Sequence, residues 1–151
     1  GHLAETFELM ADLESLCTRY AATRMSAIER RALEACHLSS GELVRRGDRE
    51  RYAAHNIELH GLVYRGSHNR ALEETAQAMR RRLAPYRHGQ FAVLGRLALS
   101  FAEHARVVNA IVRGDAAAAA ASMHAHVATV SVASADYVSG RAGGIAKAAA
   151  G

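Results

Sequence analysis

The chain has 151 residues, 50% of them hydrophobic and 23% charged, which gives one domain enough apolar material for a core and excludes a disordered chain. The net charge is +4, but Arg80, Arg81 and Arg82 are consecutive and would point in different directions from a helix, so no basic stripe forms. No basic segment interleaved with aromatic residues is present, and we do not expect this chain to bind DNA directly.

Composition also indicates the fold class and the compartment. Aromatic residues make up 5% of the chain and proline occurs once, so the apolar residues are mostly helix formers and predict an all-α fold. Cys17 and Cys36 belong to no CxxC motif, which indicates free core thiols in a reducing, cytoplasmic compartment. We find no apolar run near the roughly 20 residues that span a bilayer and no export signal, and therefore expect no membrane contact. Residues 1–3 are interpreted as the remnant of a cleaved tag.

The first three helices are predicted from periodicity and capping residues. The first runs from about Ala4 to Met25, and its apolar stripe comprises Phe7, Leu9, Leu13, Leu16, Cys17 and Tyr20. The second begins near Ser26, which forms a capping box with Glu29, and ends near residue 38, with residues 42–46 as a ragged end. Asp48 caps a third helix that ends at Gly66 and whose inward face carries Tyr52, Asn56, Leu59, His60 and Val63.

Three further helices complete the prediction. The fourth runs from Asn69 to about residue 86, with Pro85 weakening its last turn and with Leu72, Ala76, Met79, Leu83 and Tyr86 facing inward. The fifth covers about 94–113, after which Gly114 ends it and Asp115 caps a sixth that reaches about Val138. The segment 140–151 is rich in glycine and alanine, and we expect a flexible tail.

Four residues suggest a metal site inside this bundle. Asn56 and His60 are four apart and share a helix face, while His104 and His126 lie among apolar residues in two other helices. Converging imidazoles in a bundle are typical of a transition-metal site. A single histidine on an apolar face is more often a hydrogen-bonded core residue, so spacing alone leaves both interpretations open.

Several short motifs occur in a specific order. They are Asn56-Ile57-Glu58-Leu59-His60, Gly66-Ser67-His68-Asn69, Glu103-His104 followed by Asn109-Ala110-Ile111, Gly114-Asp115, and His124-Ala125-His126. This succession resembles the FCD domain, the C-terminal effector-binding domain of FadR-type regulators in the GntR family, over about residues 7–127. The resemblance assigns residues 4–139 to an antiparallel bundle of six or seven helices around a central pocket, with a metal at its floor and a small organic acid above it. It further implies a homodimer and an N-terminal winged helix-turn-helix domain that binds DNA, and nothing in residues 1–151 resembles that domain.

The resemblance carries over to individual metal ligands. His60, His104 and His126 match the three metal-binding histidines of the family. The resemblance therefore favours metal ligands over hydrogen-bonded core histidines at these positions. Asn56 stands where many members have aspartate, and a neutral amide oxygen is a poorer ligand than a carboxylate. We expect a divalent metal, zinc first, with nickel and manganese as alternatives, and we expect the effector's carboxylate or a bound anion to supply negative charge at the metal. A metal-free site that uses the histidines as hydrogen-bond donors is the alternative within the family.

Ligand-binding residues follow from the chemistry of carboxylates. Guanidinium groups bind carboxylates through two hydrogen bonds, so Arg80 is the first candidate and Arg87 the second. Asn69 matches the turn asparagine of the family and is equally well placed as a helix N-cap, and Ser100 lies one turn before His104. Met10 stands near the position of a pocket arginine in many relatives, which suggests a less anionic effector or a different anchor.

Two other classes of function were weighed. A three-histidine metal in a bundle suits a hydrolase or an oxygen-binding protein, but the Glu-x-x-His pairs of di-iron bundles are absent, and Glu103 diverges from its neighbour His104 on the helix. A metal-free dimerisation module is the third option. We therefore expect a non-enzymatic sensor domain in which effector binding shifts helix packing and so the spacing of attached DNA-binding domains.

Overall fold

Helices account for nearly all of the structure, a computed structural model that describes the backbone of residues 2–149 and the side chains of residues 2–140. Within the described residues there are seven α-helices and one 3₁₀ helix, and no strand occurs there. The predicted all-α fold is confirmed. The helices are α1 (His2–Arg24), α2 (Ala27–Ser39), α3 (Gly41–Arg46), α4 (Arg49–Gly66), α5 (Arg70–Arg87), η1 (His88–Ala92), α6 (Arg96–Arg113) and α7 (Ala116–Ala149).

The predicted capping residues set the helix starts. Side-chain oxygens of Ser26, Asp48, Asn69 and Asp115 accept hydrogen bonds from backbone N–H groups in the first turns of α2, α4, α5 and α7. Residues 41–46, expected as a ragged end of the second helix, form the separate short helix α3. Gly114 ends α6 at φ 73°, a left-handed conformation that favours glycine.

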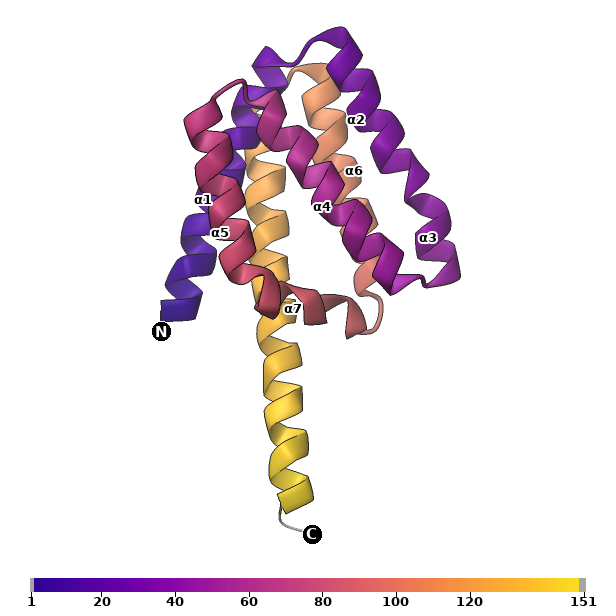
Figure 1. The fold of residues 1–151 in the computed structure, drawn as a ribbon. Helices are drawn as coiled ribbons and strands as arrows, with labels where there is room; N and C mark the ends of the chain where they lie inside the picture. The colour runs from indigo at the N-terminus through magenta and orange to yellow at the C-terminus, as the bar shows by residue number, and fades with distance from the viewer. Residues whose placement is uncertain (1, 150–151) are drawn as a thin grey trace.

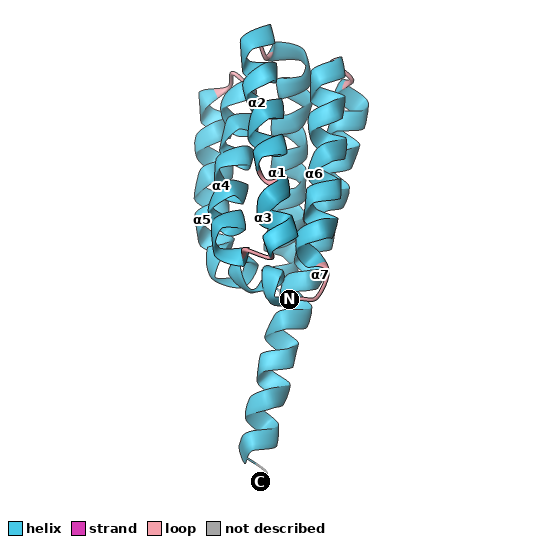
Figure 2. Ribbon diagram, turned by 90° about the vertical axis from the view of Figure 1, so that its right-hand side faces the viewer, coloured by secondary structure: helices cyan, strands magenta, loops and turns pink. Residues whose placement is uncertain are grey.

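The long helices run up and down the bundle, so that neighbours in sequence are antiparallel (Figure 1). α1 packs along α7 and α4, and α6 packs between α7 and α2. η1 lies at one end of the bundle, where α5 ends and α6 begins, and contacts both α5 and α7 (Figures 1 and 2). This arrangement brings α4, α6 and α7, which carry the three predicted histidines, around one interior.

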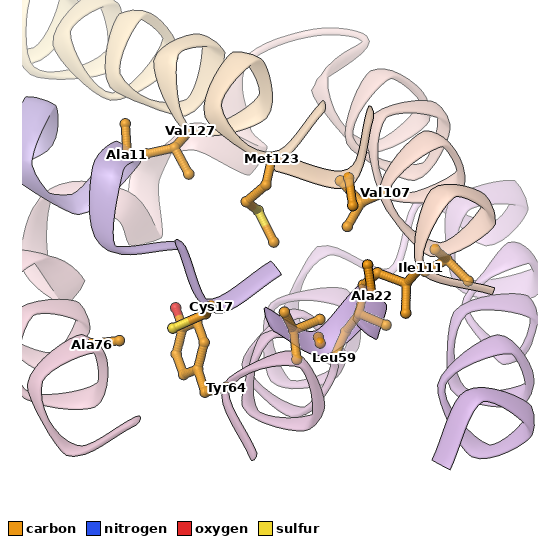
Figure 3. Packing of buried hydrophobic residues seen from close by; sticks show 14 of the residues in the cluster. Ala11, Cys17, Ala22, Leu59, Tyr64, Ala76, Val107, Ile111, Met123 and Val127 are labelled. Atoms are coloured by element: carbon orange, nitrogen blue, oxygen red, sulfur yellow. The ribbon is translucent and has the colours of Figure 1, made fainter. Parts of the chain in front are cut away.

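The apolar core is formed mainly by α1, α4, α6 and α7. Figure 3 shows side chains of these helices gathered in the interior, among them Cys17, Leu59, Val107, Met123 and Val127. Burial of such side chains supplies most of the stabilisation of a helical bundle of this size, at about 25 cal/mol per Å² of apolar surface removed from water.

Two predicted inward faces need correction. On α1, Phe7 and Cys17 are buried as predicted, and Leu13 and Tyr20 are partly buried against the core. Leu9 and Leu16, however, are 48% and 38% exposed, and the buried face also carries Met10, Ala11, Glu14 and Thr18. The buried carboxylate of Glu14 pairs with groups of α4 and α5 on this face. On α5, Tyr86 is exposed rather than inward.

The last helix is longer than predicted. The backbone of α7 continues to Ala149 and extends past the end of the bundle (Figure 1), where a tail was expected from residue 140. The alanines of this segment favour a helix and its glycines disfavour one, and the flexibility of the segment stays a prediction.

The bundle part of α7 also corrects the hydropathy prediction. The segment Ala116–Gly140 is long and apolar enough to cross a membrane, a property missed by counting uninterrupted apolar runs. Its Ala119, Met123 and Val127 are buried against the rest of the bundle, and the core helix of a bundle meets the same criterion of length and composition.

Candidate metal centre and adjoining cavity

The three predicted histidines meet at the centre of the bundle. His60 comes from α4, His104 from α6 and His126 from α7, and each is almost fully buried. The Nε2 atom of His104 lies 3.3 Å from Nε2 of His60 and 3.1 Å from Nε2 of His126. One ligand atom from each residue lies within 4.8 Å of the others, which is close enough for a single ion to contact all three.

A polar partner behind each ring fixes its orientation. Nδ1 of His60 donates to Oε1 of Glu14 at 2.5 Å, and Nδ1 of His126 donates to Oε1 of Glu103 at 2.8 Å. Nδ1 of His104 lies 3.3 Å from the hydroxyl of Tyr52, which in turn donates to Oγ of a buried serine, Ser100. This network assigns a proton to each Nδ1 and directs the three Nε2 lone pairs inward, as in metal sites whose ligands are oriented by outer hydrogen bonds.

The histidines are neutral at ordinary pH. Burial lowers the pKa of His60 to about 3 and also lowers the pKa values of His104 and His126. Three lone pairs that face one another at 3.1 and 3.3 Å repel, and a cation between them would remove that repulsion. The donor set therefore fits a transition metal.

Asn56 lies one turn before His60 on α4 and is buried. Its Oδ1 atom is shielded from solvent and has no hydrogen-bond partner within the described part of the chain. A buried polar atom without a partner is uncommon in folded proteins. The amide oxygen is therefore available to an additional partner, and its role as a ligand stays a prediction.

Glu14 of α1 is the centre of a buried ionic cluster. Besides the hydrogen bond from His60, it accepts one from the hydroxyl of Tyr64. Its Oε1 atom lies 3.5 Å from Nη1 of Arg80, and its Oε2 atom lies 3.6 Å from Nη1 of Arg87. Burial raises the pKa of this carboxyl, but His60 and the two arginines outweigh burial and hold the pKa well below its usual range. One negative charge thus lies between two positive ones.

Glu103 of α6 has the equivalent position behind His126. It also accepts a hydrogen bond from Nη1 of Arg96 at 2.9 Å, and Nε of Arg96 donates to Oε1 of Gln90 in η1 at 3.1 Å. Burial raises the pKa of Glu103, but His126 and Arg96 together lower it below the ordinary value. The divergence of Glu103 from His104 on the helix is what lets it reach α7.

A cavity of about 130 Å³ adjoins this centre between α4, α5 and η1. Its polar lining includes Asn56, Arg80 and Arg87, so both predicted arginines border it. Asn69 and Ser100 are not among its lining residues: Asn69 caps α5, and Ser100 accepts the hydrogen bond from Tyr52. The structure thus brings Asn56, Arg80 and Arg87 to one cavity. It gives Asn69 and Ser100 structural roles outside that cavity.

Sequence reasoning missed the residues behind the histidines. Glu14 follows Met10 by four residues and precedes Cys17 by three, so a carboxylate stands within an apolar stripe at helical spacing. That pattern was the available signal, because a carboxylate is rarely fully buried unless it is paired. Tyr52 and Tyr64 carry no comparable signal, since a buried tyrosine is common in any core.

Comparisons with known proteins agree with this architecture. A family model described as the FCD domain matches residues 5–129. Among solved structures, the chain is similar to the metal-free FCD domain of TM0439, a proposed transcriptional regulator, with a TM-score of 0.71 and 20% sequence identity. That alignment covers 90% of this chain and 93% of the other. No curated protein matched the chain in sequence.

Proposed function

The chain belongs to the FCD domain family, and from this premise we propose that it is the effector-sensing domain of a FadR-type transcription regulator of the GntR family. The observation that carries the proposal is the set of three inward Nε2 atoms next to a cavity bordered by two buried arginines. Such a domain binds a ligand and performs no reaction.

His60, His104 and His126 would hold a divalent metal, with Asn56 as a fourth ligand. All four donors are neutral, and three are imidazole nitrogens, which favours zinc or nickel over manganese. Bound there, the metal would supply a fixed positive charge and tie α4, α6 and α7 together. Glu14, Glu103 and Tyr52 orient the rings and keep each Nε2 available.

The effector would be a small carboxylic acid in the adjoining cavity, bound by Arg80 and Arg87. Guanidinium groups and a nearby amide suit a carboxylate, and the volume of about 130 Å³ suits a small ligand. We propose that ligand binding shifts the packing of α4, α5 and η1 and so changes DNA binding by a separate N-terminal domain in a cytoplasmic homodimer. DNA contact would belong to that domain.

Metal content tests the centre of this proposal. Elemental mass spectrometry of the purified chain should find about one transition metal per chain, and His104→Ala and His126→Ala should each lose it. His124→Ala is the matched control, because His124 is exposed on α7, the helix of His126, and pairs with Asp12 on the surface. Absence of metal in the wild-type chain after incubation with zinc, or its retention in both variants, would contradict the assignment.

A further inference from the structure

The cavity and the histidine centre are neighbours rather than one site. None of the three histidines lines the cavity, whereas Asn56, one turn from His60, does. A ligand in this space would therefore contact the arginines and the Asn56 side chain before any metal at the histidines.

Arg87 is the most unusual group in the cavity wall. It is 5% exposed, and neither Nη1 nor Nη2 has a hydrogen-bond partner among the described residues. Burial, together with the charge of Arg80, lowers the pKa of Arg87 to about 10, which still leaves the guanidinium charged at neutral pH. Its ion-pair partner in the described part of the chain is Oε2 of Glu14 at 3.6 Å, on a carboxylate that also pairs with Arg80. The hydrogen-bond donors of Arg87 therefore remain open to a further acceptor, which would stabilise the buried charge.

The charge balance identifies how many negative charges the acceptor carries. Arg80 and Arg87 contribute two positive charges and Glu14 one negative charge, so one positive charge is left uncompensated beside the cavity. A single carboxylate would neutralise it. Arg81 is exposed at the rim, where solvent screens its charge, and it adds little demand for a second anion.

The remaining wall describes the body of the ligand. Ala53, Ile57, Ala84 and Phe91 provide apolar surface around the cavity of about 130 Å³, and Gln77, His88 and Gln90 add polar groups to the same wall. A compact hydrocarbon group would pack against these side chains, while the exposed Ile57 and Ala84 leave the outer end of the cavity open to solvent.

We propose that Arg87 anchors a compact monocarboxylate with an apolar body, and that this binding does not require a metal at the histidines. The inference rests on the proposed effector site and specifies its ligand class. It replaces the expectation that the effector's carboxylate supplies the missing charge directly at the metal. Metal and effector then occupy separate sites that meet at Asn56.

Isothermal titration calorimetry on the full chain, freed of metal with EDTA, tests this with isobutyrate, benzoate and malonate. Isobutyrate or benzoate should bind the metal-free chain within about threefold of its affinity for the zinc-loaded chain. Malonate, a dianion without an apolar body, should bind at least about tenfold more weakly, because its second charge finds no buried partner.

Variants assign the binding to Arg87. Arg87→Met should weaken the binding of isobutyrate or benzoate at least about tenfold, as expected for loss of a charge-assisted bidentate contact. Arg87→Lys keeps the charge but not the planar guanidinium, and should lose an intermediate amount of affinity. It replaces Arg87→Met as the test if circular dichroism shows that Arg87→Met is poorly folded. Arg82→Met is the control, because Arg82 is exposed on the same helix outside the cavity lining, and it should bind like the wild type.

The outcomes separate this inference from the proposed function. Binding only in the zinc-loaded chain, or a preference for malonate, would overturn the metal-independent monocarboxylate site while leaving a metal-based effector site in place. Unchanged affinity in Arg87→Met and Arg87→Lys would overturn the role of Arg87. Elemental analysis tests the metal separately. If the chain binds a carboxylate but holds no metal, the proposed metal centre is contradicted and the Arg87 carboxylate site is supported.

Discussion

Replacing Glu14 by glutamine tests whether the buried ionic cluster holds the bundle together. Glutamine keeps the shape and an oxygen that can accept the hydrogen bond from Nδ1 of His60, but it removes the negative charge between Arg80 and Arg87. Removing one partner of a buried ion pair typically costs about 3–5 kcal/mol of unfolding free energy, and the retained hydrogen bond places Glu14→Gln near 3 kcal/mol. For a chain of this size that corresponds to a melting temperature lower by about 6–12 °C.

Urea denaturation of the EDTA-treated protein measures this free energy without a contribution from bound metal. Glu8→Gln is the matched control, because Glu8 is exposed on the same helix, and its effect should stay within about 0.5 kcal/mol. Adding Arg87→Met to Glu14→Gln should recover part of the loss, since it removes one of the two unpaired charges. A loss below about 1 kcal/mol in Glu14→Gln would refute the idea that Glu14 is an ionised partner of both arginines.

Three further measurements probe other parts of the structure. Arg30 donates to the carbonyls of residues 22, 25 and 111 and so joins the ends of α1 and α6, and Arg30→Met should lower the unfolding free energy by about 2 kcal/mol in urea denaturation, with the exposed Arg31→Met nearly neutral. Burial raises the pKa of Cys36 to about 11 and that of Cys17 to about 12, so at pH 8 iodoacetamide should modify Cys36 roughly a hundredfold more slowly than a free thiol, as followed by mass spectrometry. The rate of Cys36 modification should rise about tenfold per pH unit up to pH 10. Modification of Cys17 before Cys36 in the folded chain would contradict the observed burial. Asn56→Asp should raise zinc affinity about tenfold or more in a competition titration with a chromophoric chelator, and equal or weaker zinc binding would remove residue 56 from the ligand set.

Local signals made most of the fold predictable. Ser26, Asp48, Asn69 and Asp115 act as helix caps through contacts only three residues long, so their sequence neighbourhood contains the needed information. Ser39, Ser40 and Gly41 mark the end of α2 in the sequence, but the short helix α3 was missed because its six residues are too few to show a helical period.

The histidine centre was predictable for a related reason. The i, i+4 spacing of Asn56 and His60 fixes them on one face of α4, and the order of motifs along the chain supplied His104 and His126. What orients these rings was not predictable, because Glu14 and Tyr52 reach them across helix packing, and periodicity describes one helix at a time. The same limit explains the error on α1, where Leu9 and Leu16 follow helical spacing but are exposed, while Glu14 is buried beside partners on other helices.

The neutral residue at position 56 and the uncompensated charge at Arg87 belong to one arrangement. Both residues line the same cavity, and a carboxylate at position 56 would place a negative charge there that competes with any carboxylate ligand. It would also balance the excess positive charge from within the protein, and the cavity would lose its electrostatic preference for an anion. With asparagine, the proposed metal site has no anionic ligand at position 56, and the cavity keeps one positive charge without a counter-charge. Metal affinity and effector affinity should therefore change in opposite directions when residue 56 gains a charge, and this opposition follows from two adjacent sites that share a single side chain.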